Sequence, residues 1–192
     1  METAWPSVWL PTIRAGTGAD VFTIRLCDAL NASGVRAEIT WLPHRAEVMP
    51  WSAASPSPPA WANVAHVNSW LPRRFWPRHL PVVVTVHHLV HDPAYAPYRS
   101  ATQAAYHRSL IRPREMAAIR DAAAITTVSD YVRGTVMDFA GRQDIKTIHN
   151  WVDTSRFTPL AETARPSHVP FRLFIAGSAS RRKGIDLLPT FA

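Results

Sequence analysis

Cysteine is nearly absent from this chain, and long apolar runs are absent. The one cysteine among 192 residues, Cys27, excludes an internal disulfide framework and indicates a reducing compartment. The longest apolar runs, such as 81–86, are too short to span a bilayer. Because no basic segment precedes an apolar stretch at the N-terminus, we expect no signal peptide and a cytoplasmic protein.

The signatures of several functional classes are also missing. The chain has no Gly-x-Ser-x-Gly turn, no Walker lysine loop and no Ser/His/Asp order, which argues against a hydrolase or a P-loop enzyme. It has no zinc-finger spacing, RNP-like aromatic run or basic heptad region, so we expect no nucleic acid partner. Apolar residues make up 47% and charged residues 18%, a balance typical of a folded globular protein.

Positive charge is concentrated in one part of the chain. The net charge is +7, and eight arginines but only two acidic residues lie between residues 73 and 120. Trp61, Trp70 and Trp76 precede or overlap this segment. A local positive charge of this kind favours binding of phosphates or anionic lipid. Tryptophan together with arginine suits a membrane interface, so we expect peripheral association with the inner face of the membrane. The alternative is a solvated arginine-rich face. The arginines are Arg73, Arg74, Arg78, Arg99, Arg108, Arg112, Arg114 and Arg120.

Strand-like apolar stretches alternate with helical patterns. This alternation is typical of a parallel sheet with crossover helices, so we expect a doubly wound, Rossmann-like α/β domain over 1–150. One helix should begin near Asp20 and end before Gly34, one should run from about 100 to 122 with a break at Pro113, and one should follow Ser129. The expected strands are 7–11, 35–42, 62–68, 81–87, 123–128 and 145–149.

The last part of the chain has the pattern of a second α/β unit. A proline-containing connector, 151–170, leads to an expected strand at 171–177 and then to a turn with three cations before an apolar helix start at Ile185. Cations there oppose the helix dipole, which favours a bound anion. We expect 171–192 to be the truncated start of a second Rossmann-like domain. The cations are Arg181, Arg182 and Lys183.

Polar residues follow the first, third and fourth expected strands. Gly16-x-Gly18 lets backbone approach a phosphate, or simply makes a tight turn into the helix. The histidine cluster after the fourth expected strand could recognise a ligand or transfer protons at a cleft. The alternative is local capping by Asp92-Pro93. Both are favoured over a metal site. Ligands of doubly wound sheets bind at the carboxyl ends of the strands, where these residues meet. They are Gly16, Gly18, Asn68, His87, His88, His91 and Asp92.

Taken together, five segments resemble a family-four glycosyltransferase, whose GT-B fold has two facing Rossmann-like domains. Gly16–Asp20 resembles the opening glycine loop, and Thr85–His87 resembles a strand ending in histidine. Ile125–Tyr131 resembles the following strand and serine-capped helix. Asn150–Pro159 resembles the interdomain signature, and Ala176–Leu188 the start of the donor domain.

The resemblance implies transfer of a sugar from a nucleotide sugar, with retention and without metal or other cofactor. By resemblance, Lys183 binds the donor diphosphate with Arg181 or Arg182, and Gly16 and Gly18 abut its phosphates. His87 is the catalytic-side residue, which contacts the reacting sugar or the acceptor. The acceptor-side residues are His88, His91, Asp92 and Asn68, and the hinge residues are Asn150 and Asp153.

Three positions depart from the family pattern. Ser178 stands where arginine is frequent, Trp151 stands where glycine is common, and the paired glutamates of the donor domain would lie beyond Ala192. We therefore expect this chain alone to be an inactive fragment. The acceptor expected is a hydroxyl group of a lipid-linked or envelope glycan. The alternative is a non-catalytic binding module for anionic membrane or glycan.

Overall fold

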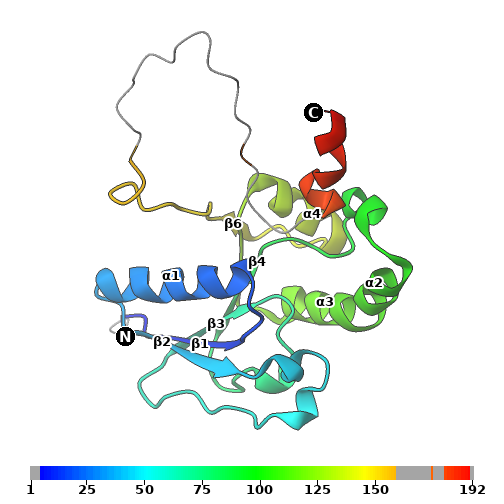
Figure 1. Ribbon diagram of the computed structural model, residues 1–192. Coiled ribbons are helices and arrows are strands. Elements are labelled where there is room, and N and C mark those ends of the chain that lie inside the picture. The colour runs from blue at the N-terminus through cyan, green and yellow to red at the C-terminus, as the bar shows by residue number, and fades with distance from the viewer. Residues whose placement is uncertain (1–4, 159–173, 175–179, 191–192) are drawn as a thin grey trace.

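Six parallel strands form one sheet in the order β2-β1-β3-β4-β5-β6. A computed structural model describes residues 5–158, 174 and 180–190 (Figure 1). The fold is the predicted α/β, Rossmann-like one, and each strand begins and ends within two residues of its expected range. The seventh expected strand, 171–177, lies outside the described residues apart from Phe174. The strands are β1 (Val8–Ile13), β2 (Ala37–Leu42), β3 (Val64–Asn68), β4 (Val82–Val86), β5 (Ala124–Thr127) and β6 (Ile145–Thr147).

Helices cover the two faces of the sheet unequally (Figure 1). The α-helices are α1 (Gly18–Ala32), α2 (Ala101–Tyr106), α3 (Arg112–Asp121) and α4 (Asp130–Ala140). Leu26 and Leu30 of α1 pack on a small core on one face, whereas Ile119 of α3 and Val136 of α4 belong to a much larger core. From β1 the chain crosses to β2 in one direction, through α1, and from β3 to β6 it proceeds in the opposite direction, through α3 and α4. Right-handed crossovers therefore place α1 on one face and α3 and α4 on the other.

Shorter helical turns fill the connections. Single turns of 3-10 helix follow β2 and β3, and longer ones follow β4 and close the described chain. They are η1 (His44–Glu47), η2 (Pro50–Ser52), η3 (Arg73–Phe75), η4 (Pro93–Tyr98), η6 (Arg181–Lys183) and η7 (Ile185–Thr190), and η5 (His107–Ile111) is a π-helical turn.

The ladder between β1 and β3 stops early. β1 pairs with β2 along its whole length but with β3 only at Val8 and Trp9. The Val8 N–H donates to Arg36 O on the β2 side, so the backbone of Trp9 and Pro11 points toward β3. Pro11 has no N–H and cannot extend the ladder. The backbone ladder between the two strands therefore ends at Trp9, although the strands remain neighbours up to the topological switch point of the sheet.

The long helix predicted for 100–122 is divided, as expected from Pro113. α2 ends at Tyr106, a π-helical turn covers 107–111, and α3 begins at Arg112 with Pro113 in its first turn. Since Pro113 lacks an N–H, the regular ladder cannot continue through it, and the wider turn absorbs the break.

Many arginines of the basic segment contact the protein itself. Arg99 Nη1 donates to Val90 O at 2.8 Å, and the Arg112 guanidinium lies 5.3 Å from the centroid of the Phe139 ring. These contacts hold cationic side chains against the fold, which weakens the case for a free basic field. Further contacts involve Arg73, Arg74, Arg114 and Arg120.

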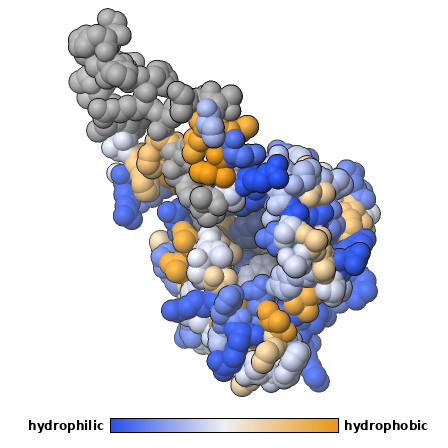
Figure 2. Space-filling model, turned by 45° about the vertical axis from the view of Figure 1, so that its right-hand side comes forward, coloured by the Kyte–Doolittle hydropathy of each residue, from blue (hydrophilic) through white to orange (hydrophobic). Residues whose placement is uncertain are grey.

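The tryptophans near this segment do not form an exposed patch. Trp76 is buried, and Trp61 and Trp70 are partly buried against the larger core. On the face shown in Figure 2, apolar side chains of the α/β body are scattered among hydrophilic ones. None of the described helices has the length and apolar character needed to cross a membrane.

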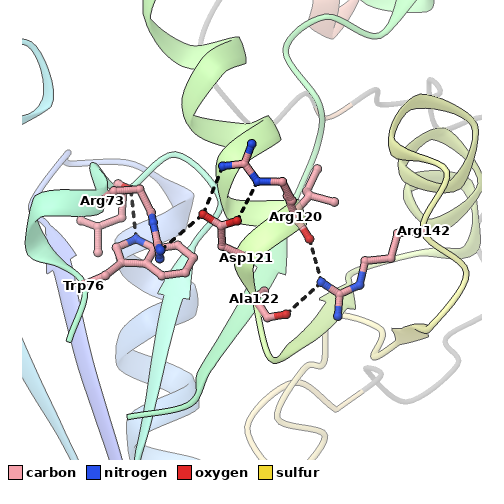
Figure 3. A network of polar contacts seen from close by, with 8 residues as sticks. Arg73, Trp76, Arg120, Asp121, Ala122 and Arg142 are labelled. Atoms are coloured by element: carbon pink, nitrogen blue, oxygen red, sulfur yellow. Dashed lines mark hydrogen bonds and ion pairs between the residues drawn. The ribbon is translucent and has the colours of Figure 1, made fainter. Parts of the chain in front are cut away.

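Asp121 connects the end of α3 to its neighbours. Asp121 Oδ1 lies 2.7 Å from Arg120 Nε, and its Oδ2 lies 3.3 Å from Arg73 Nη2 (Figure 3). Arg73 in turn lies over the Trp76 ring, 4.1 Å from its centroid. The cluster joins the segment after β3 to the last residue of α3.

Arg142 closes the same helix from the other side. Its Nη1 donates to Ile119 O at 2.7 Å and to Ala122 O at 2.9 Å, and Figure 3 shows the guanidinium pointing at the helix end. Asp144 binds the remaining face of the guanidinium through Nε and Nη2. A cation there satisfies terminal carbonyls and complements the helix dipole.

We expect Arg142→Ala to lower the free energy of unfolding by about 2 kcal/mol, because two charge-assisted bonds to carbonyls are lost. Urea unfolding measures the change. Arg133→Ala is the matched control, since Arg133 is about half exposed and its Nε lies 3.8 Å from Asp130; its loss should stay below about 1 kcal/mol. Equal losses in the two variants would contradict the assignment.

Candidate functional site

One cleft of about 410 Å³ brings together predicted residues from three distant parts of the chain. Gly18 comes from the start of α1, His87 follows β4, and Asn150 lies beyond β6. The family resemblance implies that Gly18 contacts the donor, that His87 contacts the reacting sugar or the acceptor, and that Asn150 belongs to the hinge. Arg25 and Phe22 of α1 also line the cleft, and no motif had singled them out. The remaining lining residues are Ala19, Val21 and Trp151.

Asp20 occupies the amide groups of the glycine loop. Its carboxylate accepts from Gly16 N at 2.8 Å and from Ala15 N at 3.1 Å, while Thr17 caps α1. Gly16 has φ +69°, a conformation that favours glycine, so the tight-turn alternative explains this residue. A phosphate at the Gly16 amide would have to displace Asp20.

Gly18 has no such structural reason to be glycine. Its φ is outside the left-handed range, and a Cβ added there meets no described atom within 4 Å. The residue is exposed at the first turn of α1 and lines the cleft. The space in front of it is therefore open to a ligand that approaches the backbone closely.

His87 stands in the wall of this cleft. Its ring meets Phe22 edge-on with centroids 4.4 Å apart, and its Nε2 is buried with no hydrogen-bond partner among the described residues. Burial lowers the pKa of His87, so the imidazole is neutral near pH 7. An unpaired buried nitrogen of this kind is available to a ligand hydroxyl.

A second histidine on the same face was missed by the sequence analysis. His66 Nε2 lies 2.8 Å from Thr85 Oγ1, which lies 2.7 Å from Thr126 Oγ1. Burial, and then the proximity of His87, lowers the pKa of His66 to about 4. His66 stands within an apolar strand pattern, which gave no signal of a polar chain crossing three strands.

His88 faces the cations at the end of the chain. Its ring meets Tyr95 edge-on at 4.9 Å, and the Arg182 guanidinium lies 5.9 Å from the same Tyr95 ring. Burial is the main cause of the lowered pKa of His88, and the Arg182 charge adds to it. The structure thus places one predicted donor-side cation near the histidine loop.

The cation-bearing turn differs from the expected start of an α-helix. Arg181–Lys183 forms a 3-10 turn of its own, Gly184 follows with φ +76°, and η7 is also a 3-10 helix. Arg181 Nε lies 3.6 Å from Asp186 Oδ2. Because no regular helix begins here, the cations are not held against a long helix dipole.

Two residues expected on the acceptor side have partners inside the protein. His91 is largely buried against the Phe139 ring, and its Nδ1 lies 3.3 Å from Glu115 Oε2 without hydrogen-bond alignment. Burial raises the pKa of Glu115, and His91 opposes that effect. Asn68 is buried and donates from Nδ2 to Thr12 Oγ1 at 3.2 Å, which joins β3 to β1 beyond the end of their backbone ladder.

Asp92 has the capping role that the sequence left open as an alternative. Its Oδ1 accepts from Ala94 N at 2.9 Å, and its Oδ2 accepts from the Tyr131 hydroxyl at 2.7 Å. These bonds fix η4 and join it to the start of α4. Both carboxylate oxygens are therefore engaged by the protein, with lone pairs left for a further donor.

The segment after β6 returns over α1. Trp151 meets Phe22 with ring centroids 5.5 Å apart, so the aromatic residue that replaces the family's usual glycine packs at the cleft. Asp153 Oδ1 accepts from Ser155 N and Oγ and from Arg156 N, which forms a tight local turn. The Ser155 bonds are the main cause of the lowered pKa of Asp153.

Among the described residues, His, Cys, Asp and Glu side chains form no group of three placed to hold a metal ion.

We expect the protein to lose stability as the pH falls from about 6.5 to 4. His66 is neutral in the folded state over this range, whereas the unfolded chain takes up a proton, so unfolding is favoured. Through His66 alone, each pH unit lowers the free energy of unfolding by at most about 1.4 kcal/mol. Urea unfolding of His66→Gln should show a smaller loss than the parent chain. His149→Gln, at an exposed histidine, should behave like the parent; parallel curves for all three would refute the assignment.

Comparison with known proteins agrees with the resemblance seen in the sequence. The family model for Glycosyltransferase Family 4 matches residues 60–156, just over half of the chain. A search of curated proteins finds no match to the chain. The matched region runs from the start of β3 to the turn after Asp153 and includes His87 and Asn150. The chain belongs to Glycosyltransferase Family 4.

Proposed function

We propose that the chain takes part in transfer of a sugar from a nucleotide sugar to a hydroxyl group of a glycan acceptor, lipid-linked or of the cell envelope. The observation that carries this proposal is the cleft in which Gly18, His87 and Asn150 meet. Its volume of about 410 Å³ lies within the usual range of small-molecule sites, about 300–1,000 Å³. Family membership makes glycosyl transfer the reaction to be expected there.

The donor diphosphate is proposed to lie near the first turn of α1. Gly18 leaves open space for close approach to the backbone, and the Arg25 side chain supplies a positive charge in the same cleft. Arg182 and Lys183 do not line this cleft, but η6 contacts η4, which follows the histidine loop, and in this proposal they supply further cations from that side. Charge-assisted bonds from such groups are the strong contacts to phosphate.

The transfer step is proposed to retain the configuration of the sugar. The bond between the anomeric carbon and the diphosphate oxygen breaks, a bond to the acceptor oxygen forms on the same face, and the hydroxyl proton passes to the departing diphosphate. No carboxylate is among the described residues that line the cleft, so this part of the chain supplies no acidic nucleophile. Neutral His87 can hydrogen-bond a sugar hydroxyl through Nε2.

We expect Gly18→Ala to weaken nucleotide binding without loss of stability. The new methyl group meets no described atom and slightly favours the helix, so the free energy of unfolding should rise by at most about 1 kcal/mol. Isothermal titration calorimetry with uridine, guanosine, adenosine and thymidine diphosphates measures binding. The variant should show at least a tenfold loss of affinity for each diphosphate that binds the parent chain. Gly134→Ala, within α4 and equally free of contacts, is the matched control. Equal affinities in these two variants would contradict the donor assignment.

We expect Lys183→Ala to lower affinity for the same nucleoside diphosphate about tenfold, because one phosphate-binding cation is lost. The same titration measures it. Lys146→Ala, at an exposed lysine of β6, removes equal charge far along the sheet edge and should leave affinity unchanged. If the two lysine variants bind alike, the diphosphate does not lie at the turn after Ser180.

A further inference from the structure

A second cleft lies on the other side of the first turn of α1. It has a volume of about 350 Å³ and shares Ala19 with the cleft at His87. Its walls come from the loops after β1, β2, β3 and β4 and from the π-helical turn, so it occupies the topological switch point between β1 and β3. None of the site residues expected from the sequence lines it. The lining residues are Ala15, Thr17, Ala19, His44, Glu47, Trp70, Val90, Tyr106, His107 and Ile111.

Glu47 is the fixed polar group of this second cleft. Its Oε1 accepts from the Tyr106 hydroxyl at 2.6 Å, and its backbone oxygen accepts from Arg114 Nη1 at 2.6 Å. These partners come from α2 and α3, about sixty residues away in sequence, and hold the loop after β2 in place. Oε2 lies 3.4 Å from Nε2 of the exposed His44. The carboxylate therefore keeps acceptor sites free in a partly exposed position.

The π-helical turn supplies the facing wall. It begins at His107, whose Nδ1 is buried without a hydrogen-bond partner among the described residues, and it ends at buried Ile111. Burial lowers the pKa of His107, and the charge of Arg99 adds to this, so its imidazole is neutral near pH 7. A neutral imidazole both donates and accepts hydrogen bonds, as does a sugar hydroxyl. π-helical turns frequently occur at functional sites.

The charges of the cleft disfavour a phosphate group. Glu47 is a carboxylate acceptor, and the described lining residues include no lysine or arginine. Of the guanidinium groups nearby, Arg114 gives Nη1 to the Glu47 backbone and Arg99 gives Nη1 to the Val90 backbone. The half-buried Trp70 adds an aromatic face to the hydroxyl-binding groups. Carboxylate, imidazole and indole together suit a ring that has hydroxyl groups on its rim and C–H groups on its face.

We propose that this second cleft binds a neutral pyranose ring of the acceptor and that Glu47 selects hydroxyl groups over phosphate. The proposal rests on the proposed function, since it assigns the acceptor side of the same transfer. The shared first turn of α1 places such a ring next to the cleft that holds Gly18 and His87. Glu47 then determines which class of acceptor the enzyme takes.

The test is titration of the isotope-labelled 192-residue chain, followed by backbone amide NMR. Methyl glucoside and methyl mannoside should shift amides of the second cleft with millimolar affinity, and glucose 6-phosphate and inorganic phosphate should not. Octyl glucoside, used below its critical micelle concentration, distinguishes a lipid-linked pyranose from a pyranose of a free glycan. Tighter binding than methyl glucoside indicates a lipid-linked acceptor, equal binding indicates a free glycan, and either result supports the site.

Variants locate the effect. Glu47→Ala should weaken glycoside binding at least tenfold, and Glu47→Lys should shift preference toward glucose 6-phosphate. His107→Ala, which leaves the Tyr106–Glu47 bond in place, should also weaken binding and guards against simple loss of folding, which thermal melts check. Glu38→Ala, at an exposed glutamate of β2, is the control and should bind as the parent does.

Three results would overturn the inference. The first is glycoside binding that Glu47→Ala and His107→Ala leave unchanged, and the second is tighter binding of the sugar phosphate than of the neutral glycosides by the parent chain. The third is that glycosides shift no amide of the second cleft. Titration with nucleoside diphosphates distinguishes these failures from failure of the donor assignment. If nucleotides bind at Gly18 while glycosides do not bind, the donor assignment stands and this inference fails. If glycosides bind in the second cleft and no nucleotide binds, this inference stands and the donor assignment at Gly18 fails.

Discussion

The missing N–H of Pro11 determines where the backbone ladder stops at the switch point of the sheet. Pro11 stands where β1 would continue its ladder to β3, and the pairing ends at Trp9. The two strands remain neighbours beyond Trp9, and a side-chain hydrogen bond from Asn68 to Thr12 joins them there. The loops that follow the strands and the first turn of α1 supply walls of two clefts.

The first turn of α1 is held in place for an electrostatic reason. Asp20 accepts from the amides of Ala15 and Gly16, and Thr17 caps the helix, so the loop provides its own anion. A carboxylate near a helix N-terminus is stabilising in itself. The loop thus has its conformation without a ligand, and Gly18 remains open to close approach. Preformed backbone reduces the ordering cost of binding.

The two faces of the sheet differ in the size of their cores and in the polar groups that they carry. The face under α3 and α4 carries most of the buried apolar side chains and is sealed by Asp121 and Arg142 at the helix end. The face under α1 has a small core, and its polar groups include His66 and His87, both with lowered pKa values because of burial. The cleft at His87 and the larger core therefore lie on opposite sides of the sheet.

The sequence alone predicted the secondary structure and the caps, which depend on residues close together in the chain. Period and composition gave the strands and helices, Pro113 gave the divided helix, and the Asp92-Pro93 pair gave the cap of η4. Family-like segments also identified His87 and Gly18 as residues of interest, and the structure brings them into one cleft.

Only the tertiary structure decided which polar residues line the clefts. His91 lies in the same motif as His87 but turns inward to Glu115, because the loop after β4 packs on α3. Glu47, Tyr106 and His107 carry no local signal, since they meet only when distant elements fold together. A pattern along the chain records burial period and turn chemistry. It does not record which side chains from separate loops converge, since that depends on the order of the strands and on the switch point between β1 and β3.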